Sequence, residues 1–293
     1  MSHLHIIALT ALAMIAFAGN SLLCRAAFNH TSIDAASFTA IRLVSGAVTL
    51  WLVVRIRGGS HTGGGNWMSA FALFAYAAGF SFAYLSLPAA TGALLLFGAV
   101  QTTMIGCGIW VGERLRRQQL VGLVLAFVGL VGLLLPGLTA PPLYGSVLML
   151  GAGVAWGVYS LRGKGVGDPS RVTAGNFLLS VPFAVALSLL MLNNTSLDNV
   201  GIWYATLSGA LASGIGYVIW YAALPAMKAT TAATVQLTVP VITALGGVAF
   251  LGEPITLRMA VAAVAILGGI ALVILDKQHT KGVPGATPKN LGR

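Results

Sequence analysis

Two short stretches of this sequence decide the fold: IWVGERLRRQ at residues 109–118 and AFLGEPITLR at residues 249–258. Both are apolar runs that end at a Gly-Glu pair. Three arginines follow the first pair closely, whereas a single arginine follows the second. When the two Gly-Glu pairs are aligned, Thr103 aligns with Thr243, and further matches extend in both directions. The chain therefore contains an internal repeat, and the difference in positive charge between its copies needs an explanation.

The composition indicates that most of the chain lies in lipid. Hydrophobic residues make up 57% of the sequence, charged residues only 8%, and the mean hydropathy is +0.91. Soluble domains carry about a quarter charged residues. A bilayer core requires about 20 consecutive apolar residues per helix. Ten such segments are predicted, at residues 6–24, 36–54, 67–87, 90–111, 119–136, 144–162, 172–192, 200–223, 229–251 and 257–275.

The positive charges indicate how these helices are oriented. If both termini lie on one side of the membrane, thirteen of the sixteen Lys and Arg residues fall on that side. Arg25 and Arg258 fall on the opposite side, and Arg42 lies within the second helix. Because cytoplasmic loops are enriched in Lys and Arg, both termini are predicted to be cytoplasmic. This bias explains the net charge of +10. No nucleic-acid partner is expected, since the basic residues form no stripe interleaved with aromatic residues.

Each copy of the repeat contains five predicted helices. The copies cover residues 1–138 and 139–275, and residues 276–293 form a predicted cytoplasmic tail. Because five is odd, the second copy must enter the membrane in the opposite orientation. The loop after Glu113 is then cytoplasmic and keeps its arginines, whereas the loop after Glu253 is external and lacks them. The predicted fold is an all-α membrane protein, with ten transmembrane helices in two inverted five-helix repeats around a central cavity, as in secondary transporters.

Several segments resemble the EamA domain, the five-helix unit of the drug/metabolite transporter superfamily. The resemblance rests on GERLRRQQLVGLVLAFVGLVGLLL (112–135), GEPITLRMAVAAVAILGGIALVIL (252–275), FTAIRLVSGAVTL (38–50), VAWGVYSLRGKG (154–165) and TVQLTVPVITALGGVAFLGE (234–253). It implies a central cavity and movement of small solutes, usually export of amino acids or related metabolites. Within the superfamily the chain is most similar to amino-acid exporters, including exporters of aromatic amino acids. The copies are not equivalent, because Val100 stands where the second has Pro240, and Ala18 stands where a Trp-Gly pair would begin.

Groups that could titrate inside the membrane are missing. The six acids and five histidines all fall in predicted loops, helix ends or termini. Transporters driven by protons or sodium ions usually carry an ionisable residue at membrane depth, so facilitated or exchange transport is expected. The same absence argues against a membrane enzyme. The sequence has no HExxH motif, no catalytic pair of carboxylates and no nucleophile beside a histidine, so no catalytic residue, cofactor or metal is expected.

An amino-acid substrate needs acceptors for its ammonium and donors for its carboxylate, and side-chain amides supply both without a fixed charge. The first, fourth and ninth helices carry amides at Asn20, Gln101 and Gln236. Each amide could equally join two helices. The other predicted contacts are Tyr84, Trp156, Tyr159, Tyr217 and Trp220 as aromatic walls and Thr243 on the face of Gln236. Aromatic stripes of this kind also pack against neighbouring helices or lipid, so both readings stay open.

Three prolines are predicted hinges. Pro88 and Pro225 lie in very short loops between the third and fourth helices of each copy, where a simple tight turn is the alternative. Pro240 is expected to break the ninth helix and to free a backbone carbonyl near Gln236.

Arg42 has two interpretations. It either snorkels to the membrane interface or contacts the anionic group of a substrate. One arginine suits the carboxylate of an amino acid better than a sugar phosphate.

The leading hypothesis is a membrane exporter of small metabolites, with amino acids, including aromatic and neutral ones, as substrates, working by alternating access of the two repeats. One alternative is an exporter of drugs, quaternary cations or nucleotide-type metabolites with the same fold. The other is a membrane protein that does not transport. The predicted location is the plasma (inner) membrane of a bacterium. The expected partners are the lipid bilayer and a small-molecule substrate, and the oligomeric state is left open, a monomer included.

Overall fold

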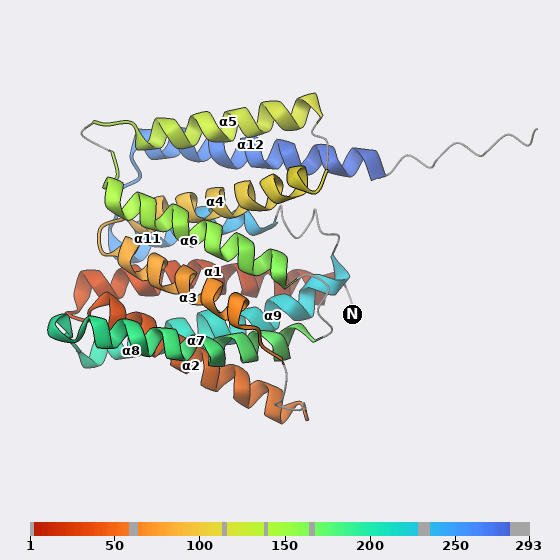
Figure 1. The fold of residues 1–293 in the computed structure, drawn as a ribbon. Helices are drawn as coiled ribbons and strands as arrows, with labels where there is room; N and C mark the ends of the chain where they lie inside the picture. The colour runs from red at the N-terminus through yellow and green to blue at the C-terminus, as the bar shows by residue number, and fades with distance from the viewer. Residues whose placement is uncertain are drawn as a thin grey trace, which may run out of the picture.

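The computed structural model describes residues 3–58, 64–112, 116–137, 140–163, 168–227 and 235–281, with side chains up to residue 274. The regular structure of these residues is helical (Figure 1). The helices are α1 (His3–His30), α2 (Ala35–Ile56), α3 (Trp67–Tyr84), α4 (Ala89–Trp110), α5 (Arg117–Leu134), α6 (Leu143–Arg162), α7 (Pro169–Leu190), α8 (Asn199–Leu207), α9 (Gly216–Ala223), α11 (Thr238–Leu251) and α12 (Leu257–Lys281). A π-helix, Ser208–Ile215, joins α8 to α9, and short 3-10 turns occupy Leu192–Asn194 and Leu224–Ala226.

The predicted all-α membrane architecture is confirmed. Within the described residues, nine helical segments are long and apolar enough to cross a membrane, with Asn199–Ala226 counted as one segment. α11 is a shorter apolar helix of 14 residues. These elements coincide with the ten predicted segments, but some boundaries differ. α1 continues to His30, past the predicted end at residue 24, and α12 continues to Lys281, past the predicted end at residue 275. α11 is described from Thr238, and residues 229–234 of the predicted ninth segment lie outside the described residues.

Polar side chains fix where several helices begin. The Asp34 carboxylate accepts hydrogen bonds from two backbone N–H groups in the first turn of α2. Asn66 and Asp168 bind the first turns of α3 and α7 in the same way, and Asp198 accepts one such hydrogen bond in the first turn of α8. These side chains satisfy backbone donors that a helix leaves unpaired at its N-terminus. Asp34, Asp168 and Asp198 therefore each cap the helix that directly follows them in the chain.

The helices of the two predicted halves interleave in the bundle (Figure 1). α2 lies against α7, α4 against α11 and α5 against α12, while α6 packs on α3 and α4, and α1 packs on α9 and α11. Glycines permit the closest approaches. A Cβ on Gly122 of α5 would meet the backbone of Gly269 on α12, and a Cβ on Gly269 would meet the backbone of Gly122. Because lipid tails give helices no hydrophobic reason to associate, close backbone packing of this kind is a main source of their association.

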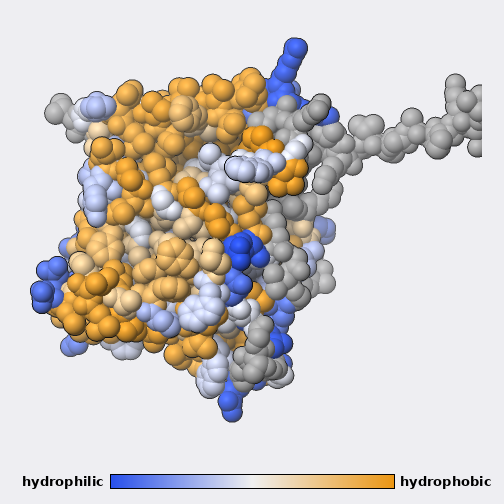
Figure 2. All heavy atoms as spheres, viewed as in Figure 1, coloured by the Kyte–Doolittle hydropathy of each residue, from blue (hydrophilic) through white to orange (hydrophobic). Residues whose placement is uncertain are grey.

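The outer surface of the bundle is apolar. Figure 2 shows hydrophobic residues covering most of the face in view. Large exposed side chains include Val124 and Phe127 on α5 and Val264 on α12. Such a surface would be unfavourable in water and is suited to contact with lipid tails. The interior, by contrast, contains a set of polar side chains that form the candidate site.

Candidate functional site

Arg42 lies inside the bundle on α2, where the residue is only 2% exposed. Its Nη2 donates a hydrogen bond of 2.9 Å to the Tyr76 hydroxyl, and its Nε donates one of 3.4 Å to Ser213 Oγ. The guanidinium carbon lies 5.0 Å from the centre of the Tyr76 ring and 4.8 Å from that of Phe80, so ring faces also stabilise the cation. Nη1 is buried without a hydrogen-bond partner among the described residues. The snorkelling interpretation is therefore wrong, because the charged group is held in the interior.

Asn20 of α1 extends this network. Its Nδ2 donates a hydrogen bond of 3.2 Å to the Tyr76 hydroxyl, and its Oδ1 accepts one of 2.6 Å from Ser208. The Tyr76 oxygen thus accepts from both Asn20 and Arg42. Among the described residues its hydroxyl acts only as an acceptor, so its O–H can donate to a further group.

Aromatic rings surround the polar groups. The Trp156 ring lies 4.8 Å from that of Tyr76, and it stacks on Tyr217 at 5.2 Å and on Tyr159 at 5.4 Å between ring centres. We call the following residues the Arg42 cluster: Asn20, Arg42, Tyr76, Trp156, Ser208, Ser213 and Tyr217. The cluster joins α1, α2 and α3 to α6, the π-helix and α9. It therefore draws on both predicted halves of the chain.

The π-helix places both serines in the cluster. Ser208 and Ser213 are five residues apart, and in an α-helix such residues would point about 140° away from each other. The i→i+5 hydrogen bonds of a π-helix bring them closer to one face, so that one binds Asn20 and the other binds Arg42. Gly209 allows the segment to approach α2, because a Cβ there would meet the Arg42 carbonyl. A sequence pattern based on 3.6 residues per turn cannot predict this arrangement.

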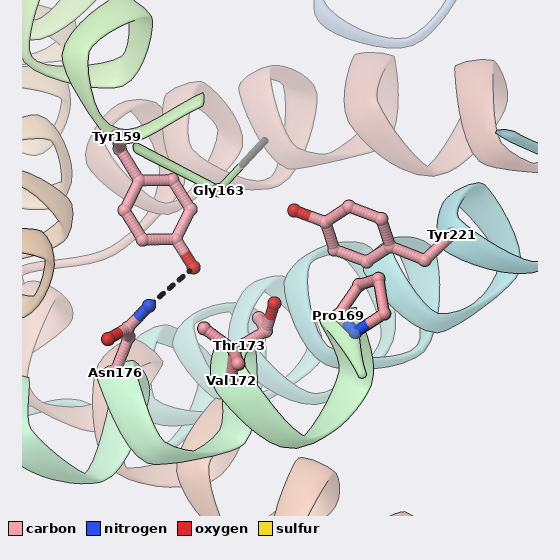
Figure 3. A pocket seen from close by; sticks show the side chains of 7 residues that line it. All are labelled: Tyr159, Gly163, Pro169, Val172, Thr173, Asn176 and Tyr221. Atoms are coloured by element: carbon pink, nitrogen blue, oxygen red, sulfur yellow. Dashed lines mark hydrogen bonds between the residues drawn. The ribbon is translucent and has the colours of Figure 1, made fainter. Parts of the chain in front are cut away.

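A narrow cleft opens beside the cluster, where α6 ends and α7 begins (Figure 3). The lining residues are Tyr159, Gly163, Pro169, Val172, Thr173, Asn176 and Tyr221. Asn176 Nδ2 donates a hydrogen bond of 3.5 Å to the Tyr159 hydroxyl, and the Tyr221 hydroxyl faces the same space from α9. Because Tyr159 also stacks on Trp156, the Tyr159 ring lies between the cleft and the Arg42 cluster.

At the opposite end of the bundle, Arg25 and Glu253 link helices from the two predicted halves. Arg25 Nε lies 2.7 Å from Glu253 Oε1, with both side chains largely buried, and Arg25 Nη1 donates to the Tyr84 carbonyl over 3.0 Å. Glu253 Oε2 accepts a hydrogen bond of 2.7 Å from the N–H of Ala89, the first residue of α4. Pro88 provides no side-chain cap there, so Glu253 caps α4, where the helix dipole favours negative charge. We call this pair the Arg25–Glu253 clasp.

The structure brings some of the predicted site residues together and separates others. Asn20, Trp156 and Tyr217 belong to the Arg42 cluster, and Tyr159 lies beside it. Tyr84 instead lies at the clasp, where its hydroxyl donates to the Ala89 carbonyl. Trp220 is buried against Phe17, at 6.0 Å between ring centres.

Three further predicted contacts lie outside the cluster. Gln101 and Thr243 are buried, and Gln101 Nε2 and Thr243 Oγ1 have no hydrogen-bond partner among the described residues. Gln236 is half-buried. No hydrogen bond in the described part of the chain joins these three side chains to Arg42 or Asn20. Their contact with substrate stays a prediction.

The sequence does not single out Tyr76, Ser208 or Ser213 as contacts. The available signal for Tyr76 is its spacing of four residues from Phe80, and of eight from Tyr84, which places all three on one side of α3. Ser213 likewise lies four residues before Tyr217. Ser208 carries no such signal, because its position beside Asn20 depends on the π-helix.

The predicted hinges lie at helix ends. Pro88 directly precedes α4, and Pro225 lies in the turn Leu224–Ala226. Pro240 is the third residue of α11, a position in the first turn where proline removes no hydrogen bond of the helix. The predicted break near Gln236 stays a prediction: residues 235 and 236 are helical, Leu237 forms a turn and α11 begins at Thr238, while residues 228–234 lie outside the described residues. Hinge motion at the three prolines stays a prediction.

The chain is similar to known proteins over most of its length. The model of the EamA-like transporter family matches residues 143–275. An uncharacterized protein of Pseudomonas aeruginosa is 56% identical over 279 residues, which cover 95% of this chain and 97% of that protein. An uncharacterized transporter of Archaeoglobus fulgidus is 26% identical, over 92% of this chain and 97% of its own. The threonine/homoserine exporter RhtA of Salmonella typhimurium is 32% identical, over 57% of this chain and 59% of its own.

A solved crystal structure shares the fold. It superposes with a TM-score of 0.67 at 19% sequence identity, covering 92% of this chain and 99% of that chain. Three observations point to the same class of protein: helices of membrane-spanning length, the family match and relatives that align over nearly their full length. The chain is a multi-pass membrane protein, and it belongs to the EamA-like transporter family.

Proposed function

We propose that the protein exports neutral amino acids and that the Arg42 cluster is its substrate site. The observation that carries this proposal is the cluster itself, in which a cation, an amide, two serines and stacked rings meet inside an apolar bundle. Polar groups at membrane depth are costly and usually mark a transport path. The carboxylate of an amino acid would find donors at Arg42 and Tyr76. Its ammonium would face Asn20 Oδ1 and the Trp156 ring.

The proposed mechanism is alternating access of two inverted repeats, residues 1–138 and 139–275. The internal sequence repeat supports it, as does the packing of helices that occupy corresponding positions five helices apart: α2 with α7, α4 with α11 and α5 with α12. Substrate enters from the cytoplasm through the cleft and passes Tyr159 to reach the cluster. Release to the outside requires the Arg25–Glu253 clasp to open. Both termini are cytoplasmic in this scheme, as the distribution of Lys and Arg favours.

The substrate class rests on charge and on the relatives. A threonine/homoserine exporter among the similar proteins supports amino acids as substrates. The rings of Trp156 and Tyr217 add room for aromatic side chains. Quaternary cations are disfavoured, because a second positive charge at the cluster would be repelled by Arg42. Nucleotide-type substrates would require more than one cation beside their phosphates.

Transport in this proposal needs no titrating acid within the membrane. The described carboxylates of Asp34, Asp168, Asp198 and Glu253 lie at helix ends or in loops, and the side chains of Glu113 and Asp276 lie outside the described part of the chain. The protein therefore works by facilitated or exchange transport, and flux does not depend on a proton gradient.

The test is flux into proteoliposomes. Labelled threonine, phenylalanine, leucine, lysine, glutamate, a nucleoside and a quaternary cation are compared with and without an imposed proton gradient. We expect flux of the neutral amino acids that does not depend on the gradient.

Trp156→Ala should reduce this flux at least tenfold, which corresponds to about 1.4 kcal/mol. The matched control Trp110→Ala, at a site 92% exposed on α4, should retain it. Flux of the cation or nucleoside alone would overturn the substrate class, and strict dependence on the gradient would overturn the energetics.

A further inference from the structure

Arg42 is a permanent charge with no counter-ion among the residues that the structure describes. A guanidinium stays protonated in proteins at any physiological pH. The described residues form an ion pair at Arg25 and Glu253, at the end of the bundle. The hydrogen-bond partners of Arg42 are the neutral hydroxyls of Tyr76 and Ser213. An uncompensated buried charge is strongly unfavourable, so this site calls for an anion that the described part of the chain does not supply.

The guanidinium also keeps unused donors. Nη1 has no hydrogen-bond partner among the described residues and Nη2 has one, although each nitrogen carries two N–H groups. Nη1 and Nη2 together form the planar edge that binds a carboxylate through two parallel hydrogen bonds. The unassigned O–H of Tyr76 lies beside Nη2. The free donors of the site thus match the two oxygens of one carboxylate.

We infer that Arg42 binds the carboxylate of the transported solute, and that this single negative charge, rather than the side chain, is the feature the site requires. The inference rests on the proposed function and names the group recognised at the same site. One buried cation compensates one charge, which favours monocarboxylates over dicarboxylates and phosphate esters. The rings of Trp156 and Tyr217 offer faces of weak shape selectivity, so different side chains can accompany the same carboxylate.

The experiment compares each acid with its amide, which differ in charge but hardly in shape. Purified protein is titrated with L-threonine, L-threoninamide, L-phenylalanine and L-phenylalaninamide, with ligand-induced thermal stabilisation as the readout. Flux competition by the same four compounds is measured in proteoliposomes. Arg42→Gln removes the charge and Arg42→Lys keeps it while losing the planar edge. Arg162→Gln is the matched control, because this exposed arginine binds Ser69 and Asn66 at the end of α6.

The expected result is that each acid binds at least about tenfold more tightly than its amide, since two charge-assisted hydrogen bonds are lost. Arg42→Gln should abolish this preference, Arg42→Lys should weaken it, and Arg162→Gln should retain it. If Arg42→Gln does not fold, the acid–amide comparison on the unaltered protein and on Arg42→Lys still tests whether Arg42 sets the preference for the acid. Stabilisation by chloride that the acids do not displace would show a structural counter-ion and overturn the inference.

The two proposals fail in different ways. Amino-acid flux in which amides compete as well as acids would overturn the role of Arg42 and leave the transport function standing. Acid-selective binding without flux would overturn the transport function and support Arg42 as a carboxylate site. Neither flux nor selective binding would overturn both.

Discussion

Arg25 and Glu253 are 228 residues apart in the sequence, yet the Arg25 Nε and Glu253 Oε1 atoms lie 2.7 Å apart. Arg25 belongs to α1, and Glu253 lies in the loop between α11 and α12. Because Glu253 also accepts a hydrogen bond from the first N–H of α4, and Arg25 binds the carbonyl of Tyr84 on α3, the pair fastens four segments at one end of the bundle. Any opening of this end has to break these contacts.

Removing the clasp should therefore destabilise the protein and expose this end of the bundle. Glu253→Gln loses the ion pair and weakens the cap of α4. We expect a loss of about 2 kcal/mol, between the values for exposed and buried pairs, measured as a lower melting temperature in detergent. The double variant Arg25→Gln/Glu253→Gln should cost less than the sum of the single changes. Additive effects would mean that the two residues do not act as a pair.

Asp34 links two loops at this same end, because its Oδ2 accepts a hydrogen bond of 3.0 Å from the N–H of Ser196. Acid should weaken this link. Burial of Asp34 raises the pKa of its carboxyl. Hydrogen bonds from the Ser37 side chain and from three backbone N–H groups lower this pKa by more than burial raises it, so the pKa lies below its ordinary value. A depressed pKa adds stability that is present above the ordinary carboxyl range, about pH 4, and is lost as the pH falls toward the folded-state pKa.

Asp34→Asn should accordingly be less stable at neutral pH and should lose less stability on acidification than the unaltered protein. The measurement is the melting temperature between pH 7 and pH 3. Asp198→Asn, which changes a cap with one backbone hydrogen bond, is the control and should keep the full acid sensitivity. An unchanged acid response in Asp34→Asn would contradict this assignment.

The approach of the π-helix to α2 should tolerate no added methyl group. A Cβ at Gly209 would meet the Ser45 hydroxyl and the Arg42 carbonyl, so Gly209→Ala should destabilise by about 1–3 kcal/mol and should lower substrate affinity. Gly268→Ala is the matched control, because a Cβ there meets nothing within 4 Å. Equal melting temperatures for the two variants would contradict the tight contact.

Cysteines placed in the cleft and in the loop that contains Leu197 should react with a thiol reagent from different sides of the membrane. In a Cys107→Ser background, where the remaining Cys24 is buried, Tyr221→Cys places a thiol in the cleft and Leu197→Cys places one in an exposed loop at the far end. A membrane-impermeant maleimide should label Tyr221→Cys in inverted vesicles and Leu197→Cys in spheroplasts. The reverse pattern would overturn the cytoplasmic placement of the termini.

Apolar length predicts the helices of this protein because a membrane span needs about 20 such residues whatever its partners are. The predicted ninth segment begins at residue 229, but residues 228–234 lie outside the described part of the chain, so the start of that segment stays a prediction.

Site residues are harder to predict, because several helices must meet before the site exists. Asn20 and Trp156 stand out as unusual residues in apolar helices, and both belong to the cluster. Tyr76 and Tyr84 lie on one side of α3 and look equivalent in the sequence. The structure places Tyr76 beside Arg42 and Tyr84 beside the clasp, a difference that depends on which helices pack at each depth. Likewise, the repeated Gly-Glu marks Glu253 as notable but gives no sign that its partner is Arg25.

The capping of α4 by Glu253 has a consequence for biogenesis. Helices are made in order from the N-terminus, so α4 emerges long before the loop that carries Glu253. Until that loop arrives, the first N–H of α4 lacks its carboxylate, and Arg25 lacks its counter-ion. The first five helices made alone would thus carry an incomplete helix start and an unpaired cation. Synthesis of the last two helices completes the first half as well as the second.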